Sequence, residues 1–338
     1  MPVNHRLPRF IEKRRSNMKA WPFVALALLA GGAAAQDYPA HPVKLVVTYT
    51  PGGGADTTAR IFAERLSDMW KQQVFVENRP GAGGSIGAEV VHKSAPDGYT
   101  LLLATNTHII NQVVYSKLPF DFLNDFTPLA VVTNGPMVIA VNTAQIQAKT
   151  MREFTQMLKS APGKYSYASC NVASPHHFGM EMYKHAMGID ALHIPHKGCG
   201  PAVSDTVAGH IGIVVATLPP AVPFFKQGRL RPIAILSANR SPSAPDIPTV
   251  RESGIPELKD FSLESYYGFM APPATPAAIA RKVEADVLKA AAQPELRKRL
   301  ENAGMDMLVL DSKKMMELMR SDYEKYAKAA KAANIRAE

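Results

Sequence analysis

Two glycine-rich segments in the first half of the chain have residue types suited to holding an anion. Pro51-Gly52-Gly53-Gly54 follows one apolar run, and Gly81-Ala82-Gly83-Gly84-Ser85-Ile86-Gly87 follows another. Backbone N–H groups in such loops can point at a ligand, and the dipole of a helix that begins there favours negative charge. The first segment lacks a following Lys-Ser/Thr pair, and Ile86 stands where a dinucleotide fingerprint needs glycine, so neither is a nucleotide motif. They indicate either a small-anion site or tight turns before helices.

Two side chains beside these loops could take part in chemistry. Asp56 lies at the mouth of the first loop, where it is predicted to face a ligand, to cap the next helix, or to do both. Ser85 fits a Gly-x-Ser-x-Gly pattern, which makes it a candidate nucleophile of an exported hydrolase. The glycine-rich setting has no accompanying oxyanion motif, and no nucleophile, base and orienting residue are assembled. We therefore predict that the protein is not an enzyme and has no catalytic residues.

The second half contains two histidine pairs, His176-His177 and His193-x-x-His196. Residues three apart on a strand point to opposite faces, so His193 and His196 are not expected to share an ion. The chain has two cysteines and no Cys-x-x-Cys pair. We predict no metal and no cofactor.

The elements that must position these residues follow a repeated strand, loop and helix order. Strands are predicted at 43–49, 74–77, 99–104, 165–169, 192–195, 211–216 and 231–236, with a further strand at 262–270 that returns to the first domain. Helices are predicted from a cap at Asp56, Thr57 or Thr58, over 85–93, from His176, over 202–208 and throughout the tail. Strands that each lead into a polar loop and a helix indicate an α/β protein with mainly parallel sheets.

Length and charge narrow the class of protein. The chain has 338 residues, 46% hydrophobic and 20% charged, which is typical of a folded globular protein of two domains at roughly 150 residues each. Its formal charge is +9, but residues 1–35 contain six Lys/Arg and one acid, so that segment carries +5 and the rest only +4. No basic stripe is interleaved with aromatic residues, which excludes nucleic acid as an expected partner.

The first 35 residues have the three parts of a secretory signal. A basic start precedes the apolar run from Trp21 to Ala30, and small residues precede Gln36. We predict cleavage near Ala35-Gln36 and export of the mature chain. The sequence leaves open whether translation starts at Met1 or Met18, and whether export uses the general or the twin-arginine route. In an exported protein, Cys170 and Cys199 could pair across neighbouring strand ends or stay as two thiols.

A series of short motifs runs along essentially all of the mature chain. They are Tyr38-Pro39 with Pro42 to Val47, Pro51-Gly52-Gly53 with Asp56 and Arg60, Val76 to Gly87, Pro96 to Leu102, Leu118 to Asp121, Asp125 to Pro128, Lys197-Gly198 with Gly200-Pro201-Ala202, Gly228 to Arg231, and Pro245 to Val250. In these motifs the chain resembles the Bug-type solute receptors of tripartite tricarboxylate transport systems.

This resemblance implies a two-lobed, type II periplasmic binding protein with a central cleft. The implied domains are a signal peptide at 1–35, a discontinuous first domain at 36–138 and 259–338, and a second domain at 139–258. The implied ligand is a small carboxylate, held by backbone N–H groups, hydroxyls and waters in place of an arginine clamp. The ligand contacts carried over by position are Thr50, Gly52, Gly53, Asp56, Gly84, Ser85, Thr105, Asn106, Thr107, Ser169, Asn171, Ser174, His176 and Lys197.

Three positions depart from the family's pattern. Asn171 stands where a glycine is usual, His196 where a tyrosine is common, and Ala216 where many members have an aspartate. Without that acid, an ammonium group would lack its partner. The resemblance therefore implies a carboxylate without an α-amino group.

The resemblance also implies partners. A periplasmic monomer would capture the ligand and deliver it to membrane permease subunits. The same closed form could instead report to a signalling protein, and the sequence does not separate these two readings. It also leaves the identity of the carboxylate open.

Overall fold

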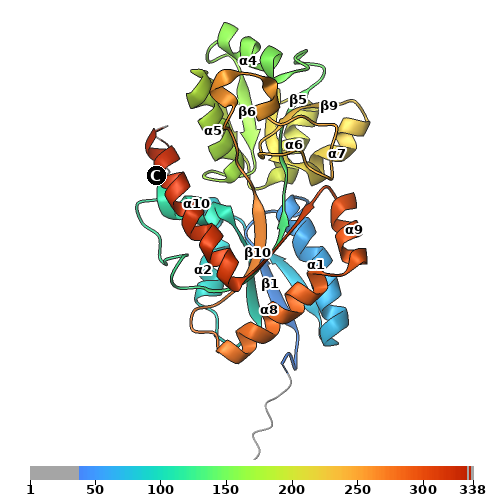
Figure 1. The fold of residues 1–338 in the computed structure, drawn as a ribbon, viewed down its shortest axis with the longest axis vertical. Helices are drawn as coiled ribbons and strands as arrows, with labels where there is room; N and C mark the ends of the chain where they lie inside the picture. Colours follow the sequence, from blue (N-terminus) through green and yellow to red (C-terminus); the bar gives the residue numbers. More distant parts are fainter. Residues whose placement is uncertain (1–37, 333–334, 336–338) are drawn as a thin grey trace, which may run out of the picture. The chain divides into compact units, whose positions relative to one another are not determined.

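The computed structural model describes residues 38–332 and residue 335 (Figure 1). The predicted signal peptide lies outside the described residues. The described residues from Pro39 onward form one compact unit, within which the strands make two sheets. Among the described residues, no helix is long and apolar enough to cross a bilayer.

The first sheet has the strand order β11-β4-β10-β3-β1-β2. Its strands are β1 (Val43–Val47), β2 (Val74–Asn78), β3 (Thr100–Thr105), β4 (Thr127–Asn134), β10 (Tyr266–Ala271) and β11 (Asp306–Asp311). β1 pairs in parallel with β2 and β3. Four of its five residues are buried, which explains its nearly continuous apolar sequence.

Helices cover both faces of this sheet, with α1 and α9 on one side and α2 and α10 on the other (Figure 1). The helices of this part are α1 (Gly54–Trp70), α2 (Ser85–His92), α3 (Asn106–Val114), α8 (Ala277–Ala291), α9 (Pro294–Asn302) and α10 (Ser312–Ala332). α10 packs on α3, and its stripe of Met315, Met319 and Tyr326 is buried. The tail therefore completes the core of the first sheet, as its helical spacing predicts.

The second sheet has the order β7-β6-β8-β5-β9. Its strands are β5 (Met137–Asn142), β6 (Ser166–Ser169), β7 (Leu192–Pro195), β8 (Ile213–Thr217) and β9 (Leu230–Ile235), and its helices are α4 (Met151–Ser160), α5 (Pro175–Met187), α6 (Cys199–Ala208) and α7 (Leu218–Lys226). β5 and β8 are buried along their whole length. Short 3-10 turns at Ala82–Gly84, Arg251–Ser253 and Pro256–Leu258 complete the described elements.

Two segments pass between the sheets, at Gly135 and before β10. The Gly135 N–H donates to the Ser265 carbonyl at 2.5 Å, so the two segments run side by side. A Cβ on Gly135 would lie 2.6 Å from the ring of Tyr267, which leaves room only for glycine. The two segments and the Tyr267 ring thus form a tightly packed joint.

The α/β fold class is confirmed, but the strand directions are more mixed than predicted. Parallel pairing occurs among β1, β2 and β3 and among β6, β7 and β8, where helices connect the strands. β10 instead runs antiparallel between β3 and β4, and β5 runs antiparallel to both β8 and β9. These antiparallel strands follow the two crossings between the sheets, so their direction is not set by a local strand-helix-strand unit.

The division of strands is compatible with the predicted domains, whose boundaries stay a prediction. Strands up to Asn134 and from Tyr266 onward belong to the first sheet, and strands from Met137 to Ile235 belong to the second. We refer to these two parts as the first and second lobes.

Candidate ligand site between the two lobes

A small cavity lies where the two lobes meet. The space open to the centre of a water molecule is about 10 Å³, roughly what one water needs. It is lined by Tyr49, Gly53, Gly54, Ala55, His176, Cys199 and Tyr267. Of the residues predicted from the sequence as ligand contacts, Gly53 and His176 are among these lining residues.

The first lobe contributes the N-terminus of α1. Gly53 is the N-cap and has no side-chain capping bond, and the helix begins at Gly54. The prediction that Asp56, Thr57 or Thr58 caps α1 is therefore wrong. The Gly54 N–H donates to Thr217 Oγ1 of the second lobe at 3.3 Å. Glycine is needed at position 54, because a Cβ there would lie 2.9 Å from the Tyr267 hydroxyl. The positive end of a helix therefore faces the cavity.

Asp56 shapes the first loop, and the prediction that it faces a ligand is not supported by its contacts. Its Oδ2 accepts from the Gly52 N–H at 3.0 Å and from Arg60 Nε at 2.9 Å, and its Oδ1 accepts from Asn78 Nδ2 at 3.0 Å. Burial raises the pKa of Asp56, but these three donors outweigh it, so the pKa lies below its usual value. The carboxylate is occupied in holding the loop.

Removal of this carboxylate should destabilise the first loop. Asp56→Asn keeps the size of the side chain but weakens the charge-assisted bonds to Gly52 and Arg60. We expect a loss of about 2 kcal/mol in the free energy of unfolding, measured in urea. Glu64→Gln, which breaks an exposed pair with Arg299, is the control and should cost less than about 1 kcal/mol. Equal losses in the two variants would contradict this role.

Thr105, Asn106 and Thr107 position the site without lining it. Thr105 caps α3 by accepting from the Thr107 N–H, and Asn106 Nδ2 donates to Tyr326 Oη at 2.8 Å. Thr107 Oγ1 forms a short hydrogen bond with the Tyr49 hydroxyl. Burial raises the pKa of Tyr49 to about 12, so the phenol stays neutral. Thr107 thus acts on the cavity through Tyr49.

The second glycine loop lies beside a group of buried polar atoms that is separate from the cavity lining. Gly84 has φ 93°, a conformation that glycine adopts without strain, and a Cβ there would lie 3.1 Å from Thr48 Oγ1 and 3.7 Å from His108 Nε2. His108 Nδ1 lies 3.1 Å from both the backbone nitrogen and the carbonyl oxygen of Thr105, so the Thr105 backbone holds the ring through this one nitrogen. Within residues 38–332, neither Thr48 Oγ1 nor His108 Nε2 has a hydrogen-bond partner.

Ser85, at the start of α2, lies outside the cavity lining as well. Its hydroxyl accepts from Asn111 Nδ2 at 3.4 Å. Among the hydrogen bonds of the described residues, none joins Ser85 to a histidine base. This arrangement gives no support to the hydrolase alternative.

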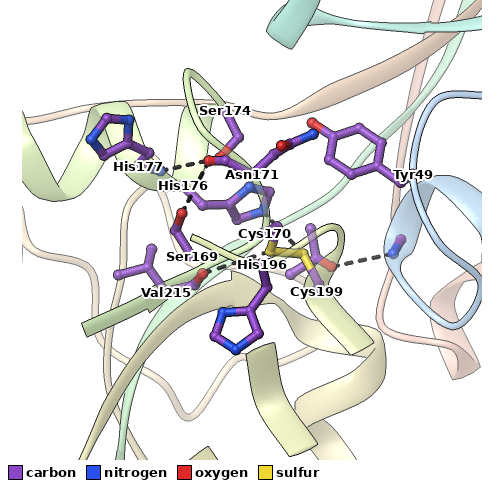
Figure 2. The surroundings of a disulfide bond; sticks show 12 residues. Tyr49, Ser169, Cys170, Asn171, Ser174, His176, His177, His196, Cys199 and Val215 are labelled. Atoms are coloured by element: carbon purple, nitrogen blue, oxygen red, sulfur yellow. Dashed lines mark hydrogen bonds between the residues drawn. A yellow bond between two sulfur atoms is a disulfide. The ribbon is translucent and has the colours of Figure 1, made fainter. Parts of the chain in front are cut away.

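In the second lobe, a disulfide joins Cys170 and Cys199, the pair that the sequence analysis raised (Figure 2). Cys170 follows β6, and Cys199 is the first residue of α6. The bond therefore ties the loop after β6 to the start of α6. The Cβ of Cys199 lies 3.6 Å from where a Cβ on Gly53 would stand, so this part of the second lobe packs on the first loop.

The loop after β6 and the start of α5 each hold a buried polar atom without a partner in the described part of the chain. Ser169 Oγ and Ser174 Oγ both donate to the Asn171 carbonyl, at 3.0 and 2.8 Å, which fixes the loop. Asn171 Nδ2 and His176 Nδ1 are buried and, in the described part of the chain, make no hydrogen bond. Burial lowers the pKa of His176 to about 3, so its ring is neutral at pH 7. Figure 2 shows the ring of Tyr49 directed toward the Asn171 loop. The two lobes therefore bring uncharged polar groups to the same region.

Lys197 joins the two lobes through its backbone and not through its side chain. Its side chain is exposed, and its carbonyl accepts from the Thr50 N–H at 3.2 Å. The next residue is Gly198, where a Cβ would lie 2.1 Å from Thr50 Oγ1. Thr50 Oγ1 is buried and, among residues 38–332, unpartnered. Gly52 is exposed, and its N–H is bonded to Asp56.

The two histidine pairs do not form a shared site. His193 Nε2 bonds Ser169 Oγ at 2.7 Å, and its ring stacks on His177 with centroids 3.9 Å apart. His196 Nε2 instead lies 2.8 Å from Asp205 Oδ2. The two residues of the His193-x-x-His196 pair thus have different partners, in line with the alternation expected along a strand.

Sequence reasoning missed Tyr49, Tyr267 and Thr217 as parts of the site. Tyr49 was seen only as the end of a strand, and Tyr267 lies in a strand more than 200 residues later. Thr217 ends β8 and meets the α1 N-terminus only in the folded chain. Their common signal is a polar side chain at the end of a buried strand.

Comparison with known proteins identifies the family. Residues 58–335 match the profile described as tripartite tricarboxylate transporter family receptor. The chain is 28% identical to an R. palustris protein solved with adipate, with a TM-score of 0.85 over 89% of this chain and 99% of that one. It is 27% identical to the periplasmic binding protein BugD, with a TM-score of 0.84 over 89% and 100%.

A further solved structure is MatC from Rhodopseudomonas palustris with bound malate. The identity is 28% and the TM-score 0.79, covering 86% of this chain and 99% of that one. Together with the two α/β sheets and their shared cavity, the profile match shows that this chain belongs to the tripartite tricarboxylate transporter family of receptors, the Bug-type solute receptors with a periplasmic-binding-protein fold.

Proposed function

We propose that this protein is a periplasmic receptor that captures a small carboxylate between its lobes and delivers it to membrane permease subunits. The observation that carries the proposal is the N-terminus of α1 at the cavity, with uncharged polar groups near it. Gly53, Gly54 and His176 line the cavity, and Asn171 Nδ2, in the loop after β6, is a buried donor without a partner among the described residues. A carboxylate oxygen is an acceptor that such donors bind without a paired cation.

The class of ligand follows from the family as well as from the donors. Solved relatives contain adipate and malate, which are both dicarboxylates. We therefore propose a di- or tricarboxylate or an aromatic carboxylate as the ligand of this chain. The cavity has room for about one water, so the lobes must separate about the joint at Gly135 and Tyr267 before such a ligand enters.

A ligand without an α-amino group fits the second lobe best. Ala216, in β8, replaces the aspartate that many members have, and no side-chain carboxylate is among the residues that line the described cavity. An ammonium group would therefore be buried without a partner, which is costly. We propose that the protein binds malate-like acids and rejects aspartate and glutamate.

Isothermal titration calorimetry tests this function. Malate, adipate, citrate, benzoate and aspartate should be titrated into the protein at fixed ionic strength. We expect heat from at least one of the acids that lack an amino group and none from aspartate. Tight aspartate binding would refute the selectivity, and no binding of any carboxylate would refute the function.

Gly198→Ala should weaken the binding of whichever carboxylate is found. Its methyl group would lie 2.1 Å from Thr50 Oγ1 in the closed form and would keep the lobes apart. We expect roughly 10- to 100-fold weaker affinity. The double variant Thr50→Ala/Gly198→Ala lacks the clashing hydroxyl. In the Thr50→Ala background, Gly198→Ala should therefore weaken binding less than it does in the wild type. If Gly198→Ala binds as tightly as the wild type, the ligand does not require this closed contact.

A further inference from the structure

The disulfide and one histidine form a cluster of soft ligand atoms at the edge of the cavity. The residues are Cys170, Cys199 and His176, which come from the loop after β6, the start of α6 and the start of α5. Their ligand atoms all lie within 4.8 Å of one another, and His176 Nε2 is 3.6 Å from Cys199 Sγ. All three side chains are buried. Figure 2 shows the imidazole beside the disulfide.

Thiolate and imidazole are the preferred ligands of zinc-like ions. With Zn–S near 2.3 Å and Zn–N near 2.0 Å, ligand atoms around one tetrahedral ion stand about 3 to 4 Å apart. The 3.6 Å between Cys199 Sγ and His176 Nε2 already lies in this range, whereas the two sulfur atoms, bonded in the disulfide, must move apart after reduction. His176 Nδ1 remains buried without a partner among the described residues, so the ring has no bond there that metal binding would break.

The disulfide occupies this site in the oxidised protein. A dithiol reductant would break the Sγ–Sγ bond, give one proton and one electron to each cysteine sulfur, and itself become a disulfide. A divalent ion would then bind two thiolates, and two protons would be released. No other co-reactant is needed.

We propose that the reduced protein binds one zinc-like ion through Cys170, Cys199 and His176. Cys199 and His176 also line the cavity, which has room for a water as the fourth ligand. The site is therefore a redox-gated metal centre with its open position toward the cavity between the lobes. This goes beyond the sequence analysis, which predicted no metal from the histidine spacing and from the lack of a Cys-x-x-Cys pair.

Cobalt titration of the full chain tests the site without any carboxylate ligand. The protein is reduced with dithiothreitol, which is removed by anaerobic gel filtration. A tricarboxylate phosphine is avoided as reductant, because it could itself bind in the cavity. We expect one Co²⁺ per chain, with a thiolate-to-cobalt charge-transfer band and the visible bands of a tetrahedral site. The oxidised protein is the same folded chain, and it should show no bound Co²⁺ and none of these absorption bands.

Variants separate this centre from adventitious thiol binding. His176→Gln should weaken cobalt affinity about tenfold or more. His196→Gln, in the same lobe but bonded to Asp205, should leave it unchanged. The proposal is overturned by the absence of the charge-transfer band in the reduced protein, by the same band in the oxidised protein, or by full affinity in His176→Gln. Circular dichroism of the reduced wild type confirms that the chain stays folded during the titration.

Discussion

Reduction of the Cys170–Cys199 disulfide is expected to lower the free energy of unfolding by about 3 kcal/mol. The two cysteines are 29 residues apart, and a cross-link of this span removes loop-closure entropy from the unfolded chain. It also ties together the two segments of the second lobe that meet the cavity. Urea unfolding with and without dithiothreitol measures the difference in midpoint.

A variant without cysteines provides the control. Cys170→Ala/Cys199→Ala should unfold at the midpoint of the reduced wild type, and dithiothreitol should not change it further. Because folded domains have about 5–15 kcal/mol in total, we expect the reduced protein to remain folded in the absence of urea. Equal midpoints for the oxidised and reduced wild type would show that the bond contributes nothing to stability.

Stability is also expected to fall as the pH is lowered from about 6.5 to about 4, with His108 as one cause. Burial lowers the pKa of His108 from 6.5 to about 4. In this pH window the unfolded chain takes up a proton at this histidine and the folded chain does not. The unfolded state therefore binds more protons and gains in population as the pH falls. The full contribution of His108 is present above pH 6.5, and about 3 kcal/mol of it is lost by pH 4.

His108→Gln isolates this effect. Glutamine at the third position of α3 can keep the capping box with Thr105, but it cannot titrate. Urea unfolding at a series of pH values should show a slope smaller than wild type by up to about 1.4 kcal/mol per pH unit. His185→Gln, at an exposed position in α5, should keep the wild-type slope. If His108→Gln keeps it too, the ring is not the group that titrates.

The first strand, loop and helix were predictable because the pattern is local. An apolar run of β-branched residues, a glycine loop and a helix with Phe62 and Leu66 on one face occur within 28 residues, Val43 to Trp70. α3 was missed because its first residues, Thr105 to His108, read as a polar strand end. Its cap uses histidine in the place where glutamate or glutamine gives the usual signal. β11 was missed because it is an edge strand without clear alternation of buried and exposed residues.

The parts of the site formed by backbone N–H groups could be predicted from the sequence. Gly53, which lines the cavity, could be singled out from the sequence because glycine loops before helices expose N–H groups. The role of Asp56 could not be predicted, because it depends on Asn78, which lies 22 residues away and reaches it only through the pairing of β1 with β2. Tyr267 escaped notice for the same reason, since only the folded chain brings it between Gly54 and Gly135.

The position of β10 sets the order in which the molecule can be assembled. This strand lies between β3 and β4, although more than 130 residues separate it from β4 in the chain. The first sheet therefore cannot close until the chain beyond Ala271 is available. The second sheet is drawn from one unbroken stretch, 137–235, and can form earlier. The second lobe is thus expected to complete its sheet first, although the first lobe begins nearer the N-terminus.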